Sequence, residues 1–296
     1  MLLRNTKMFK KSSWEHLRIP FSYYLMPVFW FGLSYTTQAS VYNILAVGII
    51  LHLFLYPSSN GYNSYYDKDE KSIGGLKNPK KVTKGLYYLS LVFFGLSLIG
   101  ALFINVAFFL MVLLYGLVSM AYSHPSVRLK KYPYLSWLTA GIFQGAFTFL
   151  MCVIGFQAAG IDLLLQTELL FPALFTTLLL LGSYPLTQVY HHEEDLKKGV
   201  ITLSLRLGKI GTFYFASLWF LVAGAAFIWY FINIDKAWAI PWFLGATSPL
   251  VVYFLYWFSL VQKDQNLYTN HTMAMGMNQV SSTCLNFFFI YYFFAQ

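Results

Sequence analysis

The sequence NGYNSYYDKDE at residues 60–70 follows a long apolar run and combines two asparagines with three acidic side chains. On a helix, Asn60, Asn63, Asp67 and Glu70 are spaced i, i+3, i+7 and i+10, so the pattern predicts that all four side chains lie on one face. Polar and ionisable groups close to a membrane are energetically costly and are usually retained for a function. We therefore interpret this stretch as half of a functional site.

A second polar stretch, QVYHHEED at residues 188–195, follows a later apolar run. Here Gln188, His191, His192 and Asp195 have the spacing i, i+3, i+4 and i+7, which again predicts one helical face. Two such faces at equivalent ends of two helices predict a single site that both helices assemble.

The composition indicates an integral membrane protein. Of the 296 residues, 58% are hydrophobic and only 10% are charged, whereas a soluble domain averages about 25% charged residues. Many apolar runs approach the roughly 20 residues that a helix needs to cross a bilayer. The fold class predicted is an all-α membrane protein with nine transmembrane helices. These occupy residues 19–35, 41–56, 86–104, 106–122, 135–156, 169–189, 213–234, 238–261 and 272–294.

The distribution of basic residues predicts the orientation of these helices. If successive loops alternate between the two sides of the membrane, 19 of the 20 Lys and Arg fall on one side, and only Lys236 falls on the other. The positive-inside rule assigns the basic side to the cytoplasm, which places the N-terminus inside, the C-terminus outside and both polar stretches at the cytoplasmic ends of their helices. Because the cations lie in loops that set orientation, the net charge of +9 does not indicate a nucleic-acid partner.

The side chains of the two polar stretches favour a Mg²⁺ site. Carboxylate and amide oxygens are hard ligands, and Mg²⁺ is commonly held by one or two carboxylates while substrate phosphates complete its shell. No Cys or third His stands at metal-ligand spacing from His191 and His192, so Mg²⁺ is preferred to Zn²⁺. The alternative is that the carboxylates are solvated loop charges paired with nearby lysines. Five cations near the clusters would bind a diphosphate: Arg128, Lys130, Lys131, Lys197 and Lys198.

The same residues carry a resemblance to a known family. The sequence resembles the UbiA superfamily of intramembrane aromatic prenyltransferases, over essentially the whole chain. The first motif of that superfamily, usually written NDxxDxxxD, matches residues 63–71: Asn63 and Asp67 are kept, Ser64 replaces the first Asp and Lys71 replaces the last. In its second motif, Asp195 and the tail TLSLRLG at residues 202–208 fit closely, while His191 stands in place of an Asp.

The resemblance implies nine helices around a central cavity, with the site facing the cytoplasm. It also implies a Mg²⁺-dependent transferase that ionises an isoprenyl diphosphate and passes the isoprenyl group to a lipophilic, typically aromatic (quinone-precursor-like) acceptor. Asp67 and Asp195 are the candidate catalytic residues. The candidate metal ligands are Asn63, Asp67, Glu70, His191, Glu194 and Asp195, and the candidate substrate-binding residues are Asn60, Tyr122, Gln188 and His192.

The domain organisation predicted is a basic cytoplasmic segment, residues 1–18, and one nine-helix UbiA-like domain, residues 19–296. The N-terminal segment has no apolar core followed by a small-residue cleavage site, so no cleaved signal peptide is expected, and the bacterial cytoplasmic membrane is the predicted location. Two other functions remain open at this point. One is a transporter, which would place polar groups in broken helices near the midplane of the membrane. The other is a non-catalytic protein that binds an isoprenoid lipid.

Overall fold

Apolar helices make up most of the structure, a computed structural model that describes residues 10–36 and 38–296. Within these residues there is no strand, and the pairing of Ile73 with Leu76 is an isolated bridge. Seven helices there are long and apolar enough to cross a membrane: Val41–Asp67, Lys84–Leu102, Val106–Ser123, Pro133–Gln157, Thr167–Leu186, Lys209–Asn233 and Ala239–Lys263. The structure is therefore that of a multi-pass membrane protein.

The remaining two predicted spans are helical but do not meet the same criteria. Residues 19–35 form a 3₁₀ segment, η2 (Ile19–Leu25), followed by the short helix α2 (Met26–Leu33), which has a proline in its first turn. The last helix, α15 (His271–Phe294), has 24 residues but a more polar composition. The nine-span arrangement and the orientation of the termini therefore stay predictions.

The chain divides into two compact units, each described here by itself. Unit 1 contains the described parts of Met1–Tyr23, Thr36–Lys130 and Met151–Leu163. Unit 2 contains Tyr24–Tyr35, Lys131–Leu150 and Leu164–Gln296.

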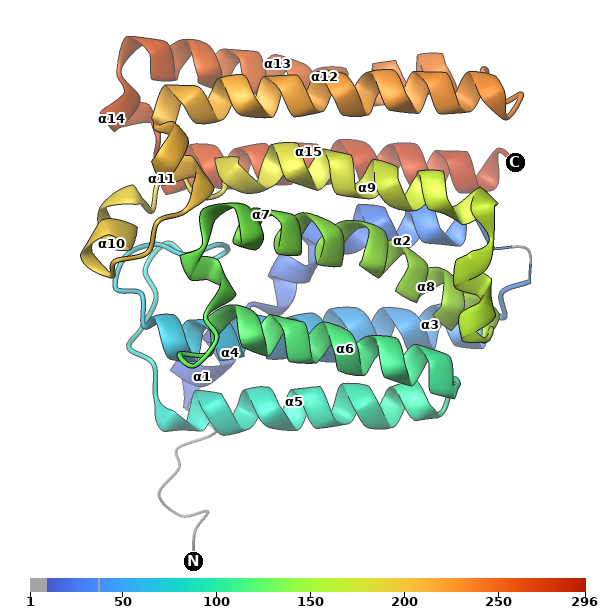
Figure 1. Ribbon diagram of the computed structural model, residues 1–296, viewed down its shortest axis with the longest axis horizontal. Helices are drawn as coiled ribbons and strands as arrows, with labels where there is room; N and C mark the ends of the chain where they lie inside the picture. The colour runs from blue at the N-terminus through green and yellow to red at the C-terminus, as the bar shows by residue number, and fades with distance from the viewer. Residues whose placement is uncertain (1–9, 37) are drawn as a thin grey trace, which may run out of the picture. The chain divides into compact units, whose positions relative to one another are not determined.

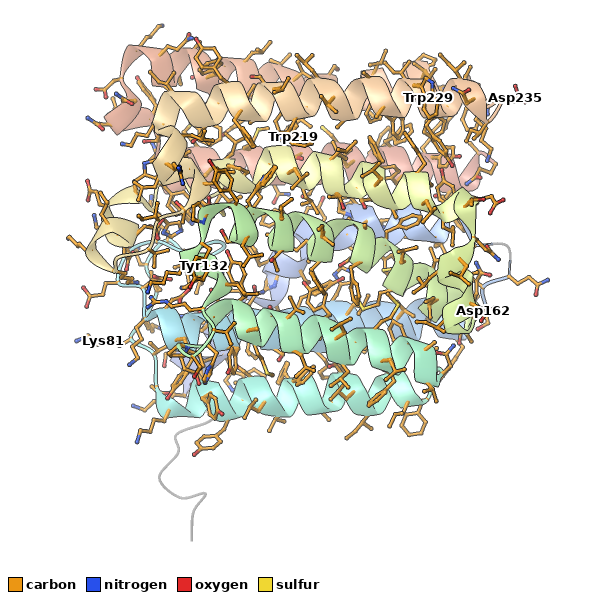
Figure 2. The ribbon with its side chains drawn as sticks, viewed as in Figure 1. Lys81, Tyr132, Asp162, Trp219, Trp229 and Asp235 are labelled. Atoms are coloured by element: carbon orange, nitrogen blue, oxygen red, sulfur yellow. The ribbon has the colours of Figure 1, made fainter. Side chains whose placement is uncertain are left out.

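Three neighbouring helices form the centre of unit 1. A continuous helix runs through α3 (Val41–Ile49), the π-helical turn η3 (Ile50–Leu55) and α4 (Tyr56–Asp67). Helix α4 packs against α5 (Lys84–Leu102) and α6 (Val106–Ser123), which form the predicted tight hairpin (Figure 1). Lys81 and Asp162 lie at opposite ends of this unit (Figure 2).

Two asparagine side chains close the end of unit 1 that lies away from Asp67. Helix α8 (Thr148–Gln157) ends there and leaves backbone carbonyls without helical partners. Asn43 Nδ2 donates to the carbonyl of Phe156 at 3.1 Å, and Asn105 Nδ2 donates to that of Ala159 at 2.8 Å. The start of α3 is thereby tied to the last turn of α8, and the start of α6 to the segment that follows α8.

The N-terminal helix α1 (Lys11–His16) is fixed to the loop between α4 and α5. The buried His16 contacts the carbonyl oxygen of Lys80 through Nε2 at 2.6 Å, and Lys80 Nζ forms a 2.8 Å ion pair with Glu15. Arg4 and Lys7, which belong to the predicted basic segment, lie outside the described residues.

Unit 2 is built around α9 (Thr167–Leu186), which packs against α7 (Pro133–Ile142), the π-helical turn η5 (Phe143–Phe147) and α12 (Lys209–Asn233). Helix α15 packs against α2 and α13 (Ala239–Lys263), and Figure 2 shows Trp219 and Trp229 along α12 with Asp235 just beyond its end. Five short elements complete the described chain: η4 (Leu129–Lys131), η6 (Ile161–Leu165), α10 (His192–Lys197), α11 (Leu203–Leu207) and α14 (Gln265–Tyr268).

A glycine allows a close approach between η5 and the backbone of α9 in unit 2. A Cβ atom at Gly145 would lie 2.7 Å from both the Cα and the backbone N of Thr177 on α9. The adjacent Ala146 N–H donates to Thr177 Oγ1 at 3.0 Å, so the threonine satisfies a donor in the π-helical turn. Small residues at such crossings let helix backbones pack closely within a membrane.

Candidate active site

Helix α4 carries Asn60, Asn63 and Asp67 as predicted and ends directly after them. Lys68 adopts a left-handed conformation with φ 50°, which terminates the helix. The three side chains therefore share one helical face. Glu70 lies beyond the helix end in an exposed loop, so the prediction that it lies on this face is wrong.

Asn63 and Asp67 contact each other and helix α6. Asn63 Nδ2 donates to Asp67 Oδ2 at 2.8 Å and to Ser123 Oγ at 2.9 Å. Both hydrogens of the amide group are thus in use, and its oxygen is the part of the side chain that can still accept a bond or bind a cation. One turn earlier, Ser59 and Ser119 form an equivalent hydrogen bond between the same helices.

Ser123 is a site residue that the sequence analysis missed. It is 2% exposed and holds the amide group of Asn63. A signal was present in the sequence, since Ser119 follows Ser59 by the same 60 positions that separate Ser123 from Asn63. That common offset is what two helices in fixed register would produce.

Lys130 forms an ion pair with Asp67. Its ammonium group contacts Asp67 Oδ1, and the two side chains are only 12% and 10% exposed. Arg128, two residues before Lys130, has a left-handed φ of 48°. Its backbone N–H donates to the carbonyl of His124 at 2.8 Å, which closes the turn that leads to Lys130. The structure thus places Lys130, a predicted diphosphate-binding residue, in direct contact with Asp67, a predicted metal ligand.

Other predicted residues of unit 1 contribute differently. Ser64 is 2% exposed, and no described residue hydrogen-bonds to its hydroxyl, so it is packed away from solvent. The backbone carbonyl of Asn60 accepts a 3.2 Å hydrogen bond from Arg18, which also donates to the carbonyl of Gly74 at 3.1 Å. Tyr122 lies on α6 directly before Ser123 and is partly exposed.

The second polar stretch does not form the predicted continuous helix. Helix α9 ends at Leu186, a turn follows, and the six-residue helix α10 (His192–Lys197) begins after it. Gln188 lies in the turn, so the prediction that it shares a helical face with Asp195 is wrong. Gln188 is 8% exposed, and none of the described residues bonds to its Oε1, while the ring of His191 packs against Tyr190 at 4.1 Å.

The tail TLSLRLG holds α10 in place. Thr202 Oγ1 donates to Asp195 Oδ2 at 3.4 Å and accepts from Leu205 N at 3.3 Å, so it caps α11 and orients Asp195. His192 Nε2 contacts Ser204 Oγ at 2.8 Å, and Ser204 in turn contacts Thr212 Oγ1 at 3.0 Å. His192 is therefore directed at buried hydroxyl groups of its own unit.

The other charged residues of unit 2 that the sequence analysis singled out lie on or beside α10, apart from Lys131 on η4. Glu194 is 8% exposed and pairs with Lys198 at 2.9 Å, one helical turn away. Lys197 is exposed on α10, and Lys131 is exposed at the end of η4.

Stability should decline in acid because of His192. Burial, followed by the charges of Lys209 and His191, lowers the pKa of His192 from 6.5 to about 4. Since the unfolded chain takes up this proton first, the contribution of His192 to stability is intact above about pH 6.5 and is lost as the pH falls toward 4. Between pH 7.5 and 4.5, thermal unfolding should show a smaller fall in Tm for His192→Gln than for the wild type. Glutamine does not titrate in this range and still offers Ser204 a hydrogen-bond partner. Equal losses in both proteins would contradict the assignment.

The donor set around Asp67 fits Mg²⁺. Among residues 10–36 and 38–296, no three His, Cys, Asp or Glu side chains are grouped as a metal site. Mg²⁺ does not need such a cage, because one or two carboxylates suffice when phosphate oxygens and water complete the octahedron. The Asp67 carboxylate and the Asn63 amide oxygen are hard donors one helical turn apart, with Lys130 beside them.

Solved structures of other proteins share this fold. A UbiA homolog from Archaeoglobus fulgidus bound to DMAPP and Mg²⁺ has a similar structure at 18% identity, with a TM-score of 0.70 over 96% of this chain and 98% of that chain. The same homolog bound to GPP and Mg²⁺ gives 19% identity and a TM-score of 0.66 over 96% of this chain and 99% of that chain.

A digeranylgeranylglyceryl phosphate synthase is also similar, at 19% identity and a TM-score of 0.62 over 97% of this chain and 99% of that chain. At these identities the likeness shows the fold, and no curated protein matches the sequence. The model of the UbiA prenyltransferase family matches residues 24–279, which is most of the sequence. The chain belongs to the UbiA prenyltransferase family.

Proposed function

We propose that this prenyltransferase moves an isoprenyl group from an isoprenyl diphosphate to a lipophilic acceptor within the membrane, and that the acceptor is aromatic and resembles a quinone precursor. The observation that carries the proposal is the contact of Asn63, Asp67 and Lys130 at the end of a membrane-spanning helix. Hard oxygen donors beside a cation suit a magnesium diphosphate, and the relatives bound to DMAPP or GPP with Mg²⁺ support this choice of substrate.

The proposal assigns roles to residues of both units. Asn63, Asp67 and Asp195 would hold Mg²⁺, which when bound neutralises negative charge on the leaving diphosphate. The five cations Arg128, Lys130, Lys131, Lys197 and Lys198 would bind the diphosphate oxygens. Glu70, His191 and Glu194 as ligands, and Asn60, Tyr122, Gln188 and His192 as substrate contacts, stay predictions.

The reaction that these groups support is an ionisation followed by capture. The allylic C–O bond breaks and both of its electrons leave on the diphosphate oxygen, where the cations stabilise the developing charge. The acceptor then supplies an electron pair to the allylic carbon, and the released diphosphate takes up the proton that the acceptor loses. Apolar helices around the reacting carbon would exclude water, which otherwise competes for the cation.

The location of the site follows from charge. We assign both clusters to the cytoplasmic side of a bacterial cytoplasmic membrane, because the loops that carry them are basic and the positive-inside rule places such loops in the cytoplasm.

Transfer should depend on Mg²⁺. The purified protein in lipid would be given labelled DMAPP, GPP and longer isoprenyl diphosphates, each with a panel of aromatic and other lipid acceptors. Labelled product and free diphosphate are expected with Mg²⁺ and should fall to background with EDTA, because the leaving group then lacks its neutralising cation.

The same assay separates the alternatives. Label that binds without forming product or free diphosphate for any acceptor would identify a non-catalytic isoprenoid-binding protein. Label that crosses sealed vesicles unchanged would identify a transporter.

A further inference from the structure

Lys130 and Asp67 already satisfy each other's charge. The ammonium contacts Asp67 Oδ1, while Asp67 Oδ2 accepts the 2.8 Å hydrogen bond from Asn63. Both carboxylate oxygens are therefore engaged, and the two charged side chains are almost fully enclosed. An ion that binds Asp67 must displace the ammonium of Lys130 or lie beside it.

Each half of a magnesium diphosphate is disfavoured alone at this pair. A divalent cation on Asp67 would stand next to an ammonium of like charge that has lost its partner. A diphosphate on Lys130 would take the ammonium away from the Asp67 carboxylate and place new negative charge beside it. Breaking one side of a poorly exposed ion pair is strongly unfavourable, because the remaining charge is left uncompensated.

When the two ligands arrive together, every charge keeps a partner. Asp67 would then hold the metal, and the ammonium of Lys130 would pair with a diphosphate oxygen. We infer that Lys130 couples the binding of the divalent cation to that of the diphosphate, so that neither occupies this site tightly alone. The inference rests on the proposed function and names the residue that couples the two ligands. Such coupling is reciprocal, since each ligand must raise the affinity of the other by the same factor.

A direct test measures binding rather than turnover. The protein in phosphatidylcholine nanodiscs would be titrated with Mn²⁺, followed by electron paramagnetic resonance, and with inorganic diphosphate, followed by calorimetry. Each titration is repeated with the other ligand present. Lys130→Gln should bind Mn²⁺ alone about tenfold more tightly and diphosphate alone about tenfold more weakly, a size within the usual range of coupling between sites. Lys130→Arg should behave as the wild type does.

The control is Lys80→Gln, which removes an equal charge from the exposed pair with Glu15 in the same unit. It should leave both affinities unchanged. Lys130→Met keeps the length of the side chain without its charge and serves if the glutamine variant does not fold.

The outcomes separate this inference from the proposed function. The coupling role is wrong if wild-type protein binds both ligands but the neutral variants of Lys130 bind Mn²⁺ no more tightly than the wild type. It is also wrong if Lys80→Gln raises the affinity for Mn²⁺ as much as Lys130→Gln does. If wild-type protein binds neither ligand, the proposed function fails, and the coupling role fails with it.

Discussion

Asp67→Asn should lower kcat for prenyl transfer by about 10²–10³, the usual effect of removing one group that stabilises charge in a transition state. The substitution keeps the shape of the side chain but removes the negative charge that Mg²⁺ requires, and it leaves Lys130 without its ionic partner. The measurement is the rate of product formation at saturating isoprenyl diphosphate and Mg²⁺. Asp195→Asn should give a loss of the same order, because its carboxylate is assigned to the same chemistry.

The matched controls are carboxylates far from the polar stretches within each unit. Asp162→Asn in unit 1 and Asp235→Asn in unit 2 change the same chemical group and should retain the wild-type rate. Asp235 has a φ of 57°, which asparagine adopts readily, so no strain is added. Full activity in Asp67→Asn would remove this residue from the mechanism. The double variant shows whether the two carboxylates act together, since losses that fail to add indicate coupling.

Gly145→Ala should destabilise the protein by about 1–3 kcal/mol, the typical effect of overpacking. The added methyl group would lie 2.7 Å from backbone atoms of Thr177, and a helix backbone does not move aside as a flexible side chain does. The measurement is thermal or denaturant unfolding in a fixed lipid or detergent.

Gly245→Ala on α13 is the matched control, because beyond the neighbouring backbone of its own helix no atom lies within 4 Å of its added Cβ. Alanine is favoured over glycine inside a helix by about 1 kcal/mol, so this variant should be as stable as the wild type or slightly more so. If Gly145→Ala were as stable as Gly245→Ala, α9 would not be held as close to η5 as the structure has it.

The helical face of Asn63 and Asp67 was predictable because it depends on local spacing alone. The apolar run before it continues without interruption into α4, and a period of 3.6 residues then fixes which side chains align. The end of that helix was not predictable, since Lys68 has no intrinsic preference for the left-handed conformation that stops it. For this reason Glu70 was placed on a face that it does not share.

The second polar stretch, residues 188–195, was not predictable in this way, because its conformation depends on residues outside the stretch. The positions of Gln188 and Asp195 are compatible with one helix. However, His192 contacts Ser204, which in turn contacts Thr212, and Asp195 accepts a hydrogen bond from Thr202. These contacts favour a separate short helix over a continuation of α9. Spacing within residues 188–195 carries no information about such partners. The family tail at residues 202–208 is therefore explained by packing as well as by resemblance.

The asparagine bonds from Asn43 and Asn105 to the carbonyls of Phe156 and Ala159 bear on how the chain is made. A ribosome releases both asparagines long before it releases their acceptors, which lie 113 and 54 positions further on. Helices α3 to α6 must therefore wait in the membrane, with one end of their unit unsealed, until α8 has been inserted. The first unit is complete only after more than half of the protein has been synthesised, so its assembly has to overlap in time with the translation of the second.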